Sequence, residues 1–131
     1  MDYDRNNHSK YLLMYHIIFV CKYRRNALIG FEDSLKDILI TIASKSDFEV
    51  VEMECYKNHI HILVKSKPKI SILSVIRKLM QESTYLMWKN HKKHLKMYYW
   101  KENTLWSDGY FCCTIGNVSK KTITEYIRSQ G

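Results

Sequence analysis

The run of residues from Tyr11 to Cys21, YLLMYHIIFVC, most limits what this chain can fold into. It is rich in aromatic and β-branched residues and is nearly continuous in apolar character, which is typical of a strand buried on both faces. We therefore expect this run to form the central strand of a sheet. Lys22 to Arg25 follow as a basic exit from it.

Local patterns predict six further elements. Apolar residues recur at helical spacing in three segments, and three others carry the alternation or β-branched content of strands. In the second helix we expect an inner stripe of Leu73, Ile76, Leu79, Met80, Ser83 and Leu86. In chain order, the elements are a helix at 31–46, strands at 48–55 and 59–65, a helix capped by Ser71 that weakens near Asn90, a strand at 106–115 and a helix at about 120–130.

This order of elements predicts an α+β fold of the ferredoxin-like, split βαβ type. Strands 48–55 and 59–65 are separated only by a short turn and are expected to pair as a hairpin. Helices are expected on one face of an antiparallel sheet. The last helix is an addition to that arrangement, following a turn at Gly116-Asn117.

Composition indicates one domain over residues 1–131, with 46% apolar residues and a single Pro. No stretch is apolar and long enough to cross a membrane, and the polar N-terminus does not resemble a signal peptide. The four cysteines match neither a zinc pattern nor a disulfide framework, so we expect free thiols in a cytoplasmic protein.

Basic residues are concentrated in the second half of the chain. Residues 57–101 hold eleven Lys or Arg and one acid, a net charge of +10, whereas the remainder holds ten basic and twelve acidic residues, a net charge of −2. A basic block favours a nucleic-acid partner, although it is also compatible with a solvated surface. Aromatic residues lie within or close to the block and either stack on unpaired bases or belong to the core: Tyr85, Trp88, Tyr98, Tyr99, Trp100 and Trp106.

His59 and His61 are two residues apart on a predicted strand, so both imidazoles face the same side. Ile60, Ile62 and Val64 then face the core. Two neighbouring imidazoles on a rigid strand are plausible metal ligands, but alone such a pair is more often two half-exposed polar residues.

The last predicted helix brings a second pair of polar groups to one face. Tyr126 and Gln130 are four residues apart. A Gln oxygen suits Mg²⁺ or Mn²⁺, and a Tyr hydroxyl beside such an ion is a reasonable nucleophile. Taken alone, Tyr126 is equally an ordinary residue of an amphipathic helix.

Three segments carry a resemblance to a known family: NHIHILV at 58–64, LWSDGYF at 105–111 and TITEYIRSQ at 122–130. In this order and spacing, the chain resembles the HUH single-tyrosine transposases of the insertion-sequence 200/605 group. YHIIFVCKYRR at 15–25 is similar as well, so the resemblance covers nearly the whole chain.

The resemblance implies that Tyr126 attacks a phosphate of single-stranded DNA and forms a 5′-phosphotyrosine. It implies a divalent ion, Mg²⁺ or Mn²⁺, held by His59, His61 and Gln130. It also implies homodimers that bind DNA hairpins near the ends of the mobile element. Asn58 departs from the family pattern, which often has Asp before the first histidine.

For DNA-backbone contacts we expect Arg77, Lys78, Lys89, Lys92 and Lys93. His91 and His94 are interpreted as solvated, and His16 as a core histidine or a partner of the metal ligands. The alternative function is that of a non-catalytic, ferredoxin-like domain that binds single-stranded nucleic acid.

Overall fold

A computed structural model describes residues 4–6, 9–11 and 13–115. Its main sheet has four antiparallel strands in the order β4-β5-β3-β6. The strands are β3 (Leu13–Val20), β4 (Glu49–Cys55), β5 (His59–Ser66) and β6 (Phe111–Ile115). Helix α1 (Glu32–Ser44) connects β3 to β4, and α2 (Ile72–Lys96) lies between β5 and β6. This topology confirms the predicted ferredoxin-like α+β fold.

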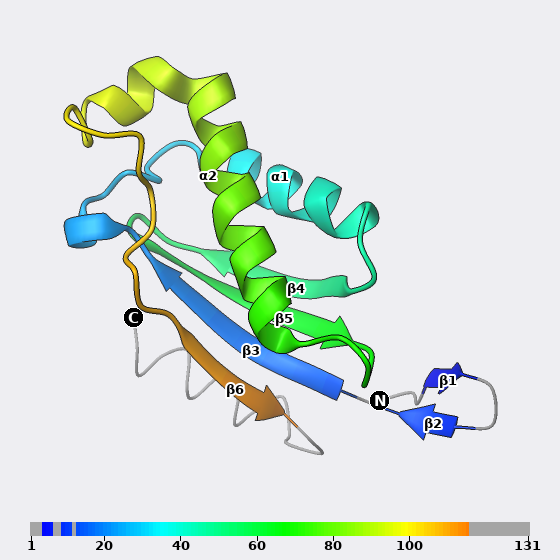
Figure 1. Cartoon of the computed structure of the whole chain (residues 1–131). Coiled ribbons are helices and arrows are strands. Elements are labelled where there is room, and N and C mark those ends of the chain that lie inside the picture. The colour runs from blue at the N-terminus through cyan, green and yellow to red at the C-terminus, as the bar shows by residue number, and fades with distance from the viewer. Residues whose placement is uncertain (1–3, 7–8, 12, 116–131) are drawn as a thin grey trace.

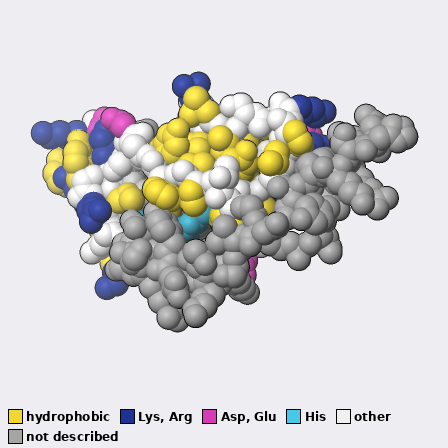
Figure 2. Space-filling view, turned by 90° about the horizontal axis from the view of Figure 1, so that it is seen from below, with side chains coloured by type: hydrophobic (Ala, Val, Ile, Leu, Met, Phe, Trp, Pro, Cys, Tyr) yellow, Lys and Arg dark blue, Asp and Glu magenta, His cyan; other side chains and the backbone are white. Residues whose placement is uncertain are grey.

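Both helices cover the same face of the sheet (Figure 1). The core lies between these layers because alternate residues of the strands point toward the helices. Ile17 and Phe19 of β3 are fully buried there, as are Ile60, Ile62 and Val64 of β5. The opposite face of the sheet carries His16 and Ile18 of β3 next to His61 of β5. Figure 2, seen from below the view of Figure 1, shows a histidine among apolar side chains.

The predicted first strand is divided in the structure. Tyr11 belongs to β2 (Ser9–Tyr11), which pairs with β1 (Asp4–Asn6) in a separate two-stranded sheet. The central strand β3 begins only at Leu13. Continuous apolar character gives no signal for a break between two consecutive strands.

The last described strand is shorter than predicted. We expected it to begin at Trp106, but β6 begins at Phe111. Trp106 forms an isolated bridge with Cys21, so this residue touches the edge of the sheet before the strand starts. Gly109, where a bend was expected, lies in the irregular segment between these two points.

Helix α2 is longer than predicted, and one residue of its predicted inner stripe is exposed. It continues past Asn90 to Lys96, with a kink at His91, where φ is −135° and ψ is 38°. Ser71 is at the N-cap position, but its side chain makes no capping hydrogen bond. Leu73 is exposed, contrary to the predicted stripe. The rest of the stripe is confirmed: Ile76, Leu79 and Ser83 are buried, and Met80 and Leu86 pack against the core. Val75 and Met87 are also buried.

Candidate active site

The site is formed by the end of β5 and the strands beside it. Both histidines of the pair are on the face of β5 that points away from the helices, as alternation predicted. Their ring centroids are 5.1 Å apart. His59 is half-buried, whereas His61 is only 1% exposed. The pair is therefore not two half-exposed residues on an open surface.

His59 is oriented by its immediate neighbours in the chain. Its Nδ1 donates to Oδ1 of Asn58 over 2.8 Å, since an amide oxygen only accepts. Its ring stacks on Tyr56 with centroids 4.6 Å apart and an interplanar angle of 14°. The Tyr56 hydroxyl donates to Oε2 of Glu54 over 2.7 Å. The amide of Asn58 thus performs the orienting role that a carboxylate would perform at this position.

His61 is oriented by a residue far away in the sequence. Its Nδ1 is 3.0 Å from Nε2 of His16 on the adjacent strand β3, and one of these two nitrogens carries the shared proton. The rings also stack, with centroids 5.2 Å apart. His16 is 2% exposed, which fits the prediction of a core histidine that supports the pair.

The Nε2 atoms of both histidines are buried and make no hydrogen bond with any residue that the structure describes. A buried polar nitrogen without a partner is costly, on the order of 1–3 kcal/mol. In the tautomer with the proton on Nδ1, each Nε2 presents a lone pair. For His59 the bond to Asn58 selects that tautomer, and for His61 the bond to His16 is compatible with it. These two nitrogens are suited to ligate a metal ion.

Burial keeps the two rings neutral at neutral pH. It lowers the pKa of His61 to about 4, assisted by the neighbouring charges of His16 and His59, and opposed by Glu54. Burial, and then the positive charge of Arg24, lowers the pKa of His59. A neutral imidazole is the form that binds metals.

Glu54 and Tyr56 were not predicted as parts of the site. A cavity of about 100 Å³ is lined by His16 and His61 together with Glu52 and Glu54 of β4. Alternation along β4 was the available signal: Glu54 pairs with His61 in register and therefore faces the same side. Across residues 4–6, 9–11 and 13–115, no group of three His, Cys, Asp or Glu side chains is placed to hold an ion.

The other expected site residues lie outside the described part of the chain. Tyr126 and Gln130, with their helix and the turn at Gly116-Asn117, are among residues 116–131. Their roles as nucleophile and third ligand stay predictions.

The residues expected to contact DNA all lie on α2. Arg77, Lys89, Lys92 and Lys93 are exposed, and Lys78 is partly exposed, with Nζ 3.9 Å from Oε2 of Glu82. Because α2 covers the face of the sheet opposite to the histidines, this basic surface and the histidine pair are on different sides of the molecule (Figure 1).

The structure corrects the prediction for His91 and His94. Neither is solvated: both are half-buried and pack against Phe31, with ring centroids 4.7 and 3.9 Å from it. Nε2 of His91 is 2.6 Å from Oγ of Ser34, and Nε2 of His94 donates to the carbonyl of Ala27 over 2.6 Å. They hold the end of α2 onto α1 and the segment before it.

The aromatic residues near the basic block differ in exposure, and Tyr98 is half-buried. Trp88, Tyr99 and Trp106 are buried, and their polar atoms bind backbone or side-chain oxygens. Tyr85 and Trp100 are mostly exposed. All four cysteines are free, as predicted.

Comparison with known proteins fixes the family. The family model described as "Transposase IS200 like" matches residues 9–130. The chain belongs to this family. Among curated relatives of this IS200-like transposase, ISDra2 transposase TnpA of Deinococcus radiodurans is 36% identical over 121 residues, covering 92% of this chain and 85% of the relative. The transposase for insertion sequence element IS200 of Salmonella typhimurium is 32% identical over 124 residues, covering 94% and 80%.

Solved structures agree with this assignment. A putative transposase from Deinococcus radiodurans superposes with a TM-score of 0.79 at 30% identity, covering 97% of both chains. A REP-associated tyrosine transposase bound to a REP hairpin shares the fold, with a TM-score of 0.55 at 13% identity over 93% of this chain and 68% of the other. This IS200-like transposase is thus a DNA-cleaving enzyme of transposition. No helix in its described part is long and apolar enough to cross a membrane.

Proposed function

We propose that this transposase cuts and rejoins single-stranded DNA through a 5′-phosphotyrosine on Tyr126. The observation that carries the proposal is the pair of buried Nε2 atoms of His59 and His61, which have no partner within the described part of the chain. Both rings are held through their Nδ1 atoms. Gln130 is proposed to complete this ligand set for Mg²⁺ or Mn²⁺. A divalent ion bound there supplies positive charge that polarises the scissile phosphate.

The proposed reaction has two steps. The oxygen of Tyr126 loses its proton and forms a bond to phosphorus, while the bond from phosphorus to the 3′-oxygen breaks and that oxygen takes up a proton. In the second step, a 3′-hydroxyl of another end attacks the phosphotyrosine and releases the phenol. The covalent intermediate conserves the energy of the phosphodiester, so no nucleotide cofactor is consumed.

We propose that hairpins near the element ends bind the basic surface of α2, through Arg77, Lys78, Lys89, Lys92 and Lys93. The REP-associated tyrosine transposase that shares the fold is bound to a REP hairpin, which supports this kind of partner. A homodimer is proposed because two DNA ends must be cut and exchanged together.

The test uses single strands from the DNA flanking the gene, labelled at the 3′ end, incubated with Mg²⁺ or Mn²⁺ and analysed on a denaturing gel. A 5′-phosphotyrosine leaves the 3′ fragment on the protein, so the label must migrate with the protein. The same strand labelled at its 5′ end must instead give a shorter free fragment. Chelation of the ion and His59→Ala must both abolish cleavage.

Tyr126→Phe must abolish the adduct while binding to the strands is retained. Tyr98→Phe is the matched control, because it removes a hydroxyl from a half-buried tyrosine after α2 and must leave the adduct yield unchanged. An adduct of normal yield in Tyr126→Phe would refute the nucleophile. Mixing Tyr126→Phe with His59→Ala shows whether the site is shared: an adduct in the mixture requires residues from two subunits.

A further inference from the structure

Two exposed aromatic side chains lie at the end of the sheet where β3 leaves it. Tyr23 belongs to the 3₁₀ helix η1 (Lys22–Arg24) and is 65% exposed. Trp100 follows α2 and is 64% exposed. Leaving such large rings in water forgoes a substantial burial free energy. An exposed pair therefore suggests contact with a ligand.

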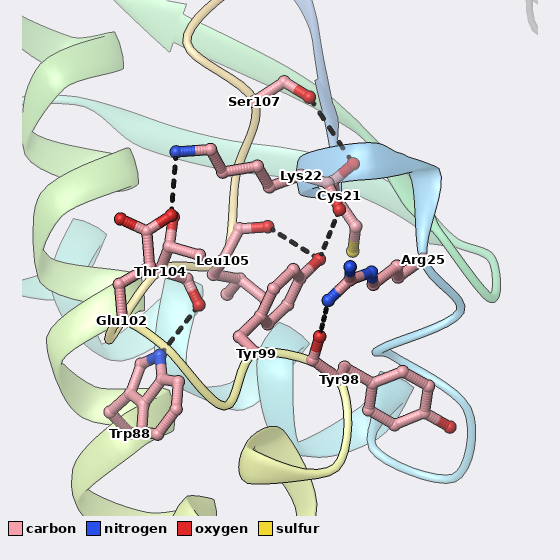
Figure 3. A network of polar contacts seen from close by, with 10 residues as sticks. All are labelled: Cys21, Lys22, Arg25, Trp88, Tyr98, Tyr99, Glu102, Thr104, Leu105 and Ser107. Atoms are coloured by element: carbon pink, nitrogen blue, oxygen red, sulfur yellow. Dashed lines mark hydrogen bonds and ion pairs between the residues drawn. The ribbon is translucent and has the colours of Figure 1, made fainter.

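Arg25 lies against both rings. Its guanidinium carbon is 4.9 Å from the Tyr23 centroid and 4.6 Å from the Trp100 centroid, within the range of cation–π contact. Its Nη1 donates to the carbonyl of Tyr98, which fixes the side chain (Figure 3). We call Tyr23, Arg25 and Trp100 the aromatic platform.

The platform joins η1 to the segment that follows α2. These two segments are far apart in the sequence but are held together by hydrogen bonds and an ion pair. The Lys22 amide donates to the Leu105 carbonyl over 2.8 Å, and the Tyr99 hydroxyl donates to the Lys22 carbonyl over 2.8 Å. The Lys22 ammonium is 3.2 Å from Oε1 of Glu102 (Figure 3). Rings on such a scaffold lose little freedom on binding a ligand, which favours affinity.

The backbone of the platform is strained. Tyr23 has φ of 62° and Arg24 has φ of 51°, which are left-handed values uncommon for residues with a side chain. Strain of this kind persists only where the surrounding structure enforces it, and it is concentrated at functional sites. In this conformation the Tyr23 ring is mostly exposed.

Charge and shape both favour a nucleic-acid ligand. The platform borders a hollow of about 370 Å³ that Lys101 and Glu102 also line, a volume typical of small-ligand sites. Arg24 and Lys101 are exposed, while the carboxylate of Glu102 forms an ion pair with Lys22. Exposed cations beside exposed rings are the combination with which proteins bind unpaired bases and their phosphates.

The platform is also close to the histidine pair. The amide of Cys21, next to η1, donates to the carbonyl of Asn58 over 2.8 Å, and Val20 pairs with His59 in the sheet. The platform and His59 therefore lie at the same end of the sheet.

We propose that the aromatic platform binds an unpaired base of the single-stranded DNA substrate, stacked on Trp100 and Tyr23, with Arg24 and Lys101 contacting the adjoining phosphates. This inference rests on the proposed function, because it assigns a further part of the same substrate. It gives the enzyme a base-dependent contact in addition to the basic surface of α2.

The test measures binding, not cleavage, at constant salt. The probes are a fluorescent oligothymidylate of about 12 nucleotides, within the range of known single-strand sites, and a strand of equal length with abasic sites throughout. The wild-type protein must prefer the strand with bases by about 5-fold to 100-fold, the range that stacking of one base provides. Trp100→Ala must reduce this preference toward equality, and Trp100→Phe must keep most of it.

Met97→Ala is the matched control, since Met97 is equally exposed at 66% and lies three residues before Trp100. It must keep the wild-type preference. Tyr23→Asn is a second variant that tolerates the left-handed backbone and must also reduce the preference. The inference is overturned if the wild-type protein shows no preference, or if Trp100→Ala and Tyr23→Asn both retain it.

The proposed roles of the aromatic platform and of Tyr126 are tested independently. Adduct formation on element ends is scored in parallel with the same protein. An adduct without base preference overturns the platform alone, and base preference without an adduct overturns the role of Tyr126 alone.

Discussion

Replacing Asn58 with Ala tests how the histidine pair is prepared for a metal ion. Asn58 Oδ1 accepts the proton on Nδ1 of His59 over 2.8 Å, which leaves Nε2 unprotonated. Without this acceptor, the proton is free to move to Nε2, and the ring is also free to rotate about its bonds. Loss of such an orienting partner typically weakens metal binding by about 10-fold to 100-fold.

The expected magnitude follows from binding linkage. At an ion concentration 100 times the dissociation constant, the ion stabilises the wild-type fold by about 2.7 kcal/mol. A variant whose dissociation constant is about 30-fold higher gains only about 0.9 kcal/mol at that same concentration. Ion-dependent stability should therefore fall by about 1.8 kcal/mol. Stability in chelator should change much less, because Asn58 is only half-buried.

The assay combines calorimetric titration with Mn²⁺ and thermal unfolding with Mn²⁺ or chelator. Asn58→Asp keeps the acceptor and adds a negative charge, so its Mn²⁺ affinity should equal or exceed that of the wild type. Asn90→Ala removes an exposed amide from α2 and should change neither quantity. The reasoning is refuted if folded Asn58→Ala binds Mn²⁺ as tightly as the wild type.

Two further predictions concern the core and the basic surface. Ser83→Ala should lower the free energy of unfolding by about 1–3 kcal/mol, because Trp106 Nε1 donates to its buried hydroxyl over 2.9 Å. Denaturant titration of Ser83→Ala, Trp106→Phe and the double variant should show that the two losses of unfolding free energy are not additive. Additive losses would contradict a stabilising role for this hydrogen bond. Alanine at Lys89, Lys92 and Lys93 should flatten the slope of log affinity for hairpin DNA against log salt by about 2 to 3, since each phosphate contact contributes roughly 0.7–0.9. Fluorescence anisotropy across a salt series measures that slope, and an unchanged slope would remove these residues from the interface.

The layers of the fold could be predicted because they depend on local periodicity. Alternation along 59–65 placed Ile60, Ile62 and Val64 in the core, and each is fully buried. Helix α1 begins and ends within two residues of the predicted bounds for the same reason: its apolar residues recur every three or four positions. The short turn between β4 and β5 gave the hairpin.

What sequence periodicity missed depends on contacts between distant residues. His91 and His94 are polar residues in a lysine-rich stretch, which favours a solvated interpretation. Their partners, Ser34 and Ala27, are 57 and 67 positions away and become neighbours only when α2 packs on α1. The helix continues past Asn90 for the same reason, because tertiary packing outweighs the weak local propensity there.

The two histidines of the candidate site differ in the same respect: His59 has local partners, whereas His61 has a distant one. This difference decides how each is tested. His59 is oriented by Asn58 and Tyr56, which are within three residues of it, so its environment belongs to the hairpin turn itself. His61 is oriented by His16, 45 positions away, through the register of β3 against β5. A change at His16 alters a buried contact of the sheet and therefore affects folding together with ligation. A change at Asn58 affects metal ligation but leaves the buried contacts of the sheet intact. Substitution of Asn58 therefore tests the proposed metal binding without disturbing the fold.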